Sequence, residues 1–190
     1  MPSRAALRAS LRAYTARDCD QRAHLDRMVA LLGVPGDPFA RDHFAPGHFT
    51  ASGFVLSPDG GSLLLVRHEK LRRWLQPGGH IDADDADVVA AARRELAEEA
   101  GLADLTLEVE GVFDLDIHVI PAFGAEPFHE HFDVRFAFRA PSDELHAGSD
   151  AKAARWVPLS EMVGETWDRS LTRAVHRLMQ RNCAAQNREG

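Results

Sequence analysis

The stretch from residue 78 to residue 102, GGHIDADDADVVAAARRELAEEAGL, decides the fold of this chain. Its second half predicts a helix, because the alanines at 90–92 favour a helix interior. Asp84 or Asp85 is placed to cap the start of this helix. Gly101 is placed to end it in a left-handed turn, which a residue without Cβ adopts at little cost.

Three carboxylates, those of Glu95, Glu98 and Glu99, lie near the end of the predicted helix. Spacings of three and four residues put them on one face, with Cβ atoms about 5–6 Å apart. Like charges at this spacing cost a few tenths of a kcal/mol per pair, and acids near a helix C-terminus also oppose the helix dipole. A bound divalent cation would offset that cost, and Mg²⁺ or Mn²⁺ prefers hard carboxylate oxygens. A solvated acidic face is the alternative interpretation.

The residues around this helix resemble the Nudix box. That pattern is a glycine, five residues, a glutamate, seven residues and then arginine-glutamate-aliphatic-x-glutamate-glutamate-x-glycine-aliphatic. Gly79 matches the first glycine, and the run from Arg94 to Leu102 matches the second half without a gap. Asp85 stands where the first glutamate is expected, and 14 residues rather than 13 separate Gly79 from Arg94. The additional residue leaves the role of Asp85, or of Asp84, open.

The resemblance implies the α/β fold of the family, a Nudix α/β/α sandwich with a mixed sheet, here with an N-terminal helical extension. Leucines and other apolar residues at helical spacing predict two helices before residue 36, with a break around residues 15–20. We expect residues 1–48 to form this helical extension and a Phe-rich link. Residues 49–183 would form the Nudix hydrolase domain, and residues 184–190 a frayed tail.

Alternating apolar and polar residues predict the strands. Segments 50–57 and 63–66 flank a turn and read as a hairpin, and 156–159 resembles a closing strand of the family. Segments 113–119 and 132–138 each present one apolar and one polar face. If these two pair antiparallel, their polar residues would form one wall of a cleft. A solvated sheet face is the alternative.

The resemblance also implies a set of functional residues. Glu95, Glu98 and Glu99, with a backbone carbonyl near Gly79, would hold one to three divalent ions, Mg²⁺ or Mn²⁺. Arg94 would brace a glutamate through a bidentate pair, and Glu95 or Glu98 would be the catalytic base. The family chemistry is hydrolysis of a nucleoside diphosphate linked to another moiety, by attack of water at phosphorus.

Candidate substrate contacts lie outside the box, and they are Trp74, Asp116, His118, His131 and Asp133. The sequence His129-Glu130-His131 also raises zinc, which we set aside because the resemblance implies an oxygen-ligated metal. His43 and His48, both in the Phe-rich link, are expected at packing or surface positions.

Composition and net charge argue against a protein that binds nucleic acid or spans a membrane. The 190 residues are 45% hydrophobic and 27% charged, as in an ordinary soluble domain, and the net charge is −7. That charge argues against a nucleic-acid backbone as partner. Neither a membrane-spanning run nor a signal peptide is evident in the sequence, so we expect a cytoplasmic protein that acts on a small nucleotide or nucleotide conjugate. The N-terminal helices leave a homodimer open.

Three other functions share this fold. A Nudix-fold regulator would bind both nucleotide and DNA, but no additional DNA-reading module is evident. An isopentenyl diphosphate isomerase would use a cysteine in the central domain, whereas Cys19 and Cys183 lie near the two ends. A catalytically inactive nucleotide-binding or regulatory module is the third, and the complete set of three glutamates argues against it.

Overall fold

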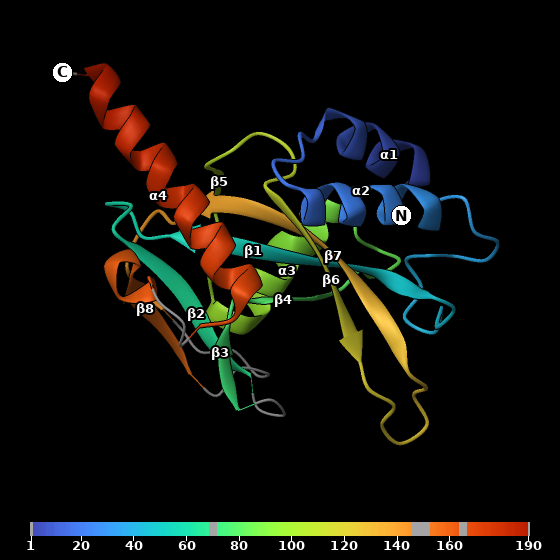
Figure 1. Cartoon of the computed structure of the whole chain (residues 1–190). Helices are drawn as coiled ribbons and strands as arrows, with labels where there is room; N and C mark the ends of the chain where they lie inside the picture. The colour runs from blue at the N-terminus through green and yellow to red at the C-terminus, as the bar shows by residue number, and fades with distance from the viewer. Residues whose placement is uncertain (1, 69–71, 146–152, 164–166, 190) are drawn as a thin grey trace.

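A mixed sheet organises the structure, a computed structural model that describes residues 2–68, 72–145, 153–163 and 167–189 (Figure 1). The strands, in chain order, are β1 (Gly47–Leu56), β2 (Ser62–His68), β3 (Arg73–Leu75), β4 (Gly78–His80), β5 (Thr106–Leu107), β6 (Asp114–Ile120), β7 (His129–Arg139) and β8 (Ala154–Pro158). The helices are α1 (Arg4–Ala13), α2 (Cys19–Leu31), α3 (Val88–Ala100), the 3₁₀ turn η1 (Leu159–Met162) and α4 (Arg169–Glu189).

The centre of the sheet is the parallel pair β1 and β7, which runs in register from Gly47 opposite Glu130 to Leu56 opposite Arg139. On one side β1 pairs with β4 and then with β2, and β2 pairs with β3 and β8. On the other side β7 pairs with β5 and β6. All pairs except β1–β7 are antiparallel, so both predicted strand pairs, β1–β2 and β6–β7, are confirmed.

Helices cover both faces of this sheet. One apolar cluster joins α1, α2 and α3 to the sheet, with Met28 and Leu96 packed in the same cluster as Phe49 of β1. The second cluster joins Val175 of α4 to Phe54 of β1. Because residues 49 and 54 point to opposite faces of a strand, the two sets of helices lie on opposite sides. Figure 1 shows α4 in front of the sheet and α3 behind it, and the α/β/α architecture with its N-terminal helices is confirmed.

Local capping explains where the N-terminal helices begin. The side chain of Ser3 accepts a hydrogen bond from the amide of Ala6, and that of Asp18 accepts one from the amide of Gln21. Asp18 is therefore the N-cap at which α2 begins, after the predicted break between the two helices. At the other end the backbone of α4 is helical through Glu189, and the divisions after residues 48 and 183 stay predictions. Within the described ranges, no helix is both long and apolar enough to cross a membrane.

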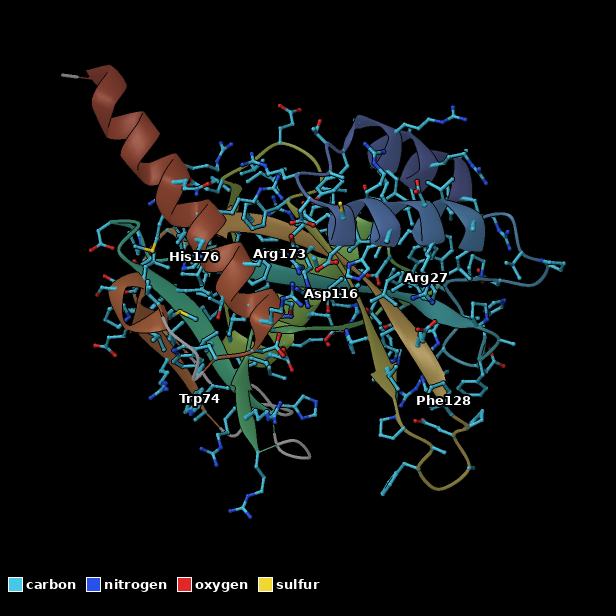
Figure 2. All side chains as sticks on the ribbon, viewed as in Figure 1. Arg27, Trp74, Asp116, Phe128, Arg173 and His176 are labelled. Carbon is cyan, nitrogen blue, oxygen red and sulfur yellow. The ribbon has the colours of Figure 1, made fainter. Side chains whose placement is uncertain are left out.

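A buried charge network lies between β6, β7 and α4. Arg135 is almost fully buried, and its guanidinium donates to Asp133 at 2.7 Å, to Asp116 at 3.1 Å and to Asp114 at 3.4 Å. Arg173 of α4 donates to Asp114 at 2.8 Å and lies 3.5 Å from Asp116 (Figure 2). The network therefore ties the start of α4 to the polar face of the sheet.

Electrostatics keep the carboxylate of Asp116 ionised. Burial alone would raise the pKa of Asp116, but the charge of Arg135 and the adjacent His118 outweigh burial and hold that pKa well below its usual range. Burial likewise disfavours the charged form of Arg135, and the carboxylates around it still raise its pKa.

We expect the N-terminal helices to contribute substantially to the stability of the whole domain. Met28 is fully buried between α2 and the sheet, so Met28→Ala should lower the free energy of unfolding by about 2–5 kcal/mol, measured by chemical denaturation. Arg22→Ala, at an exposed position of the same helix, is the control and should change it by less than about 0.5 kcal/mol. Equal stability of the two variants would show that α2 is not part of the core.

The charge network predicts a specific pH dependence. Asp116→Asn should cost about 1.5–3 kcal/mol at pH 7, because it removes a charged hydrogen-bond acceptor. The folded pKa of Asp116 is depressed, so its contribution is complete above the unfolded pKa of about 3.9 and is lost as pH falls toward the folded pKa. The stability difference between wild type and variant should therefore shrink below about pH 4.

Asp20→Asn is the control for this prediction. It removes an ion pair with Arg169 in which both side chains are exposed, and it should have little effect at any pH. A stability difference between wild type and Asp116→Asn that persisted unchanged into strong acid would contradict the assignment.

Candidate active site

Arg94, on α3, lies at the centre of a group of hydrogen bonds in the second half of the box. Its guanidinium makes two bonds of 3.1 Å to the carboxylate of Asp85. It also donates to Glu95 at 2.9 Å, to Glu98 at 3.1 Å and to the backbone carbonyl of His80 at 2.8 Å. These hydrogen bonds, first of all those to Asp85, raise the pKa of Arg94. One cation thus connects the helix, the preceding loop and β4.

The structure assigns the role of Asp85 that the sequence left open. Its carboxylate is buried, pairs with Arg94 in bidentate fashion and accepts a hydrogen bond from the amide of Asp82 at 2.8 Å. The prediction that Asp84 or Asp85 caps the helix is wrong. Asp87 is the cap, and it accepts from the amide of Ala90 at 2.8 Å. Several aspartates satisfy the local capping rule, and the attraction to Arg94 turns Asp85 inward instead.

The C-terminal half of α3 places the carboxylates of Glu95 and Glu99 beside Gly78 and Gly79 of β4. Gly101 ends α3 with φ of 67°, as predicted. The amide of Gly78 donates to the carboxylate of Glu99 at 3.0 Å. A Cβ added to Gly79 would lie 2.7 Å from the carboxylate of Glu95, so a side chain at this position would displace that carboxylate.

The three glutamates differ in exposure. The side chain of Glu95 is 14% exposed and that of Glu98 is 51% exposed. Burial raises the pKa of Glu95, while the hydrogen bond from Arg94 opposes that rise. The structure therefore brings together Glu95, Glu98, Glu99, Arg94 and Gly79, the residues to which the resemblance gives a catalytic or metal-binding role.

Trp74 lies apart from this group. Its ring packs against the guanidinium of Arg155, at 4.1 Å from the ring centroid, and against that of Arg67, at 5.9 Å. Figure 2 shows it well separated from Asp116 in the same view. These contacts with two cations explain the position of Trp74 without any bound ligand. A contact between Trp74 and the substrate stays a prediction.

The polar face of β6 and β7 is divided between two environments. Asp116 lies opposite Asp133, and both carboxylates are buried and bonded to Arg135. His118 lies opposite His131, and the side chain of His118 is 44% exposed. Of the residues predicted on this face, His118 is thus the one best placed to meet a ligand, and the two aspartates have a structural partner in Arg135.

A group of imidazoles that the sequence reasoning missed lies at one end of this face. His48 of β1 and His80 of β4 lie beside His131, with ring centroids 4.7 Å and 5.3 Å from its own. Their positions in the sequence are far apart, and only strand pairing brings them together. The sequence His129-Glu130-His131, which we set aside as a zinc signal, pointed to one part of this group, but no local pattern linked it to His48 or His80.

A cavity of about 800 Å³ lies between the start of α2 and α4. Its lining includes Arg17, Trp167, Arg169, Arg173 and Arg177, a combination of cationic and aromatic side chains. None of its described lining residues belongs to α3 or β4. The cavity is therefore separate from the carboxylates, although it reaches the charge network through Arg173.

Comparison with known families identifies the same box and fold as the geometry. A family model described as NUDIX domain matches residues 47–177. Escherichia coli strain SMS-3-5 has a relative, "Uncharacterized Nudix hydrolase NudL", that is 34% identical over 97 residues, covering 49% of this chain and 50% of the relative. A Salmonella paratyphi B relative of the same name is 33% identical over 109 residues, covering 55% and 56%. The chain spans about half the length of the curated relatives it matches.

Solved structures of similar fold agree. A hydrolase of the NUDIX family from Clostridium perfringens is 25% identical, with a TM-score of 0.53, covering 70% of this chain and 97% of that one. The NUDIX domain of Shewanella oneidensis NrtR, complexed with ADP ribose, is 18% identical with a TM-score of 0.51, covering 70% and 86%, and shows the likeness of fold alone. The family match covers the box, the sheet and the first part of α4, and the chain belongs to the Nudix family.

Proposed function

We propose that this protein is a divalent-metal-dependent hydrolase that cleaves a pyrophosphate bond in a nucleoside diphosphate linked to another moiety. The observation that carries the proposal is that Glu99 and Glu95 meet β4 at Gly78 and Gly79, while Arg94 holds Glu98 beside Glu95. Membership of the Nudix family supports it, because hydrolysis of such substrates is the general chemistry of the family.

The donor set fits Mg²⁺ or Mn²⁺. Three carboxylates and a backbone carbonyl near Gly79 are hard oxygen ligands, and the missing side chain at Gly79 leaves the strand close to the carboxylate of Glu95. Glu95, Glu98, Glu99 and the Gly79 carbonyl would hold the ion. Such an ion neutralises phosphate oxygens and lowers the pKa of a bound water.

The chain's own groups supply position and proton transfer. Arg94 fixes Glu95 and Glu98 relative to β4, so that neither carboxylate has to be ordered when substrate arrives. Glu95 is the better candidate for the base that accepts the proton of the attacking water, because burial raises its pKa. Glu98, which is more exposed, is the alternative base.

Substrate specificity lies outside the box. His118 is exposed on β6 and borders Asp116, so we assign it a contact with the substrate. A screen of nucleotides and nucleotide conjugates with Mg²⁺, scored for released phosphate or pyrophosphate, would define the substrate. A catalytically inactive module would bind such a compound in this screen without turnover.

Glu99→Gln tests the proposal, because it removes one metal-binding charge and keeps the acceptor for the amide of Gly78. Without metal, the variant should be as stable as the wild type or more stable by a few tenths of a kcal/mol, since repulsion is relieved. Mg²⁺ should raise the melting temperature of the wild type by mass action, and this rise should be mostly lost in the variant. Hydrolysis of the best substrate should fall by orders of magnitude.

Glu110→Gln, at an exposed position outside the box, is the matched control and should retain both activity and the response to Mg²⁺. If glutamine at each of positions 95, 98 and 99 left full activity, the box would be only an acidic helix. The hydrolase proposal would then be wrong.

His118→Ala tests the assigned substrate contact. The side chain is exposed, so we expect little change in melting temperature, while the KM for the best substrate should rise several-fold. Glu144→Ala, at an exposed position in the loop after β7, is the control for a change in surface composition. Unchanged steady-state kinetics of His118→Ala would assign this residue to solvent.

A further inference from the structure

The histidine group is built by strand pairing at the end of the sheet where β1 and β7 begin. His48 of β1 lies opposite His131 of β7 in the parallel register, and His80 of β4 lies opposite Thr50, two residues along β1. The three rings therefore share the polar face of the sheet. Ring centroids are 5.1 Å apart for His48 and His80, 4.7 Å for His48 and His131, and 5.3 Å for His80 and His131.

The ring nitrogens of this group converge. One nitrogen from each of His48, His80 and His131 lies within 4.8 Å of the other two. A tetrahedral ion with bonds of about 2.0–2.1 Å holds its nitrogen ligands roughly 3.3 Å apart. The three nitrogens would thus have to approach by about 1.5 Å or less, which small rotations of the side chains provide.

His48 carries the strongest indication of a ligand. Its side chain is completely buried, and Nδ1 lies 3.4 Å from the carbonyl oxygen of His43, which assigns the proton to Nδ1. Nε2 then presents a lone pair, and among the described residues this buried atom has no hydrogen-bond partner. A histidine whose one nitrogen donates to a backbone carbonyl, while the other is left as an acceptor, has the arrangement typical of a metal ligand.

The environment keeps these imidazoles neutral, the form that binds metal. Burial, together with the neighbouring histidines, lowers the pKa of His48 to about 4 and that of His131 to about 2. Burial and the charge of Arg41 lower the pKa of His80 to about 4. Near pH 7 the group therefore offers lone pairs without first losing protons.

We propose that His48, His80 and His131 form a binding site for a divalent transition-metal ion of the Zn²⁺ class. Three imidazoles without a carboxylate suit such an ion and not Mg²⁺. The fourth position falls to water or to His129, whose Nε2 lies 3.3 Å from Nε2 of His131. Nδ1 of His129 is bonded to the carbonyl of Pro127 at 2.8 Å, so this ring repeats the arrangement seen in His48.

The proposed site is distinct from the carboxylates of α3. Successive residues of a strand point to opposite faces, so His80 and Gly79 face different sides of β4. Gly79 faces Glu95, whereas His80 faces the imidazoles, and the carbonyl of His80 is held by Arg94. A strand of three residues therefore separates an oxygen donor set from a nitrogen donor set. The inference does not depend on the hydrolase proposal.

The experiment is a titration of the full-length protein, prepared without a polyhistidine tag and freed of metal with a chelator. Calorimetry should give one equivalent of bound Zn²⁺, and Co²⁺ should produce the visible absorption bands of a nitrogen-ligated, low-coordinate ion. His48→Gln and His80→Gln should each weaken Zn²⁺ binding by more than about 100-fold and remove the Co²⁺ bands, because a direct ligand matters more than its supporting partner. His131→Gln should do the same if either of the other variants fails to fold.

Two controls locate the bound ion. His176→Gln changes an exposed histidine of α4 and should leave Zn²⁺ and Co²⁺ binding intact (Figure 2). Glu98→Gln, which alters the carboxylate set, should also leave it intact. The proposal is overturned if the tag-free protein binds no Zn²⁺, or if binding survives His48→Gln and His80→Gln. It is equally overturned if Glu98→Gln, and not the histidine variants, abolishes binding.

Discussion

The guanidinium of Arg94 is the interaction on which the box depends. It bonds at once to Asp85 in the loop, to Glu95 and Glu98 on α3 and to the carbonyl of His80 on β4. Carboxylates gathered this closely repel one another, and a fixed cation among them offsets part of that repulsion. Because the same guanidinium also bonds the backbone of β4, Gly78 and Gly79 stay close to α3. A single side chain thereby sets the geometry of the candidate active site.

The second constraint is the parallel pairing of β1 and β7. It fixes which residues share a face, and so divides the polar side of the sheet into zones of different chemistry. Imidazoles gather at the end where both strands begin. The Arg135 network lies beyond them, and apolar contact with α4 occupies the other end. On α4, Arg173 thus joins the charge network, whereas Val175 packs in the apolar core.

The arrangement gives two neighbouring groups of potential metal ligands with different preferences. Oxygen donors on the α3 side suit a hard ion, and nitrogen donors on the opposite side of β4 suit a softer one. The backbone of β4 links them, since Gly78 bonds Glu99 and the carbonyl of His80 bonds Arg94. An ion bound on either side would therefore rigidify the strand that the other side uses.

The sequence by itself determined the elements and the box, because those depend on local periodicity, on spacing along one helix and on glycine at a fixed position. Strands β1, β2, β6 and β7, the N-terminal helices, the left-handed end of α3 at Gly101 and the nearness of Glu95, Glu98 and Glu99 were predictable in this way. The pairing of β6 with β7 also followed from their alternation. Each of these features is encoded within a short stretch of chain.

Only the tertiary structure decided which polar residues find which partners. Asp84, Asp85 and Asp87 all satisfied the same local capping rule. Because the carboxylate of Asp85 pairs with Arg94, it does not cap the helix, and Asp87 does. Asp116 and Asp133, two of the polar residues predicted on one face of these strands, neutralise Arg135, whose burial requires paired charges. The meeting of His48 with His131 depends on the register between distant strands, and no local pattern carries that register.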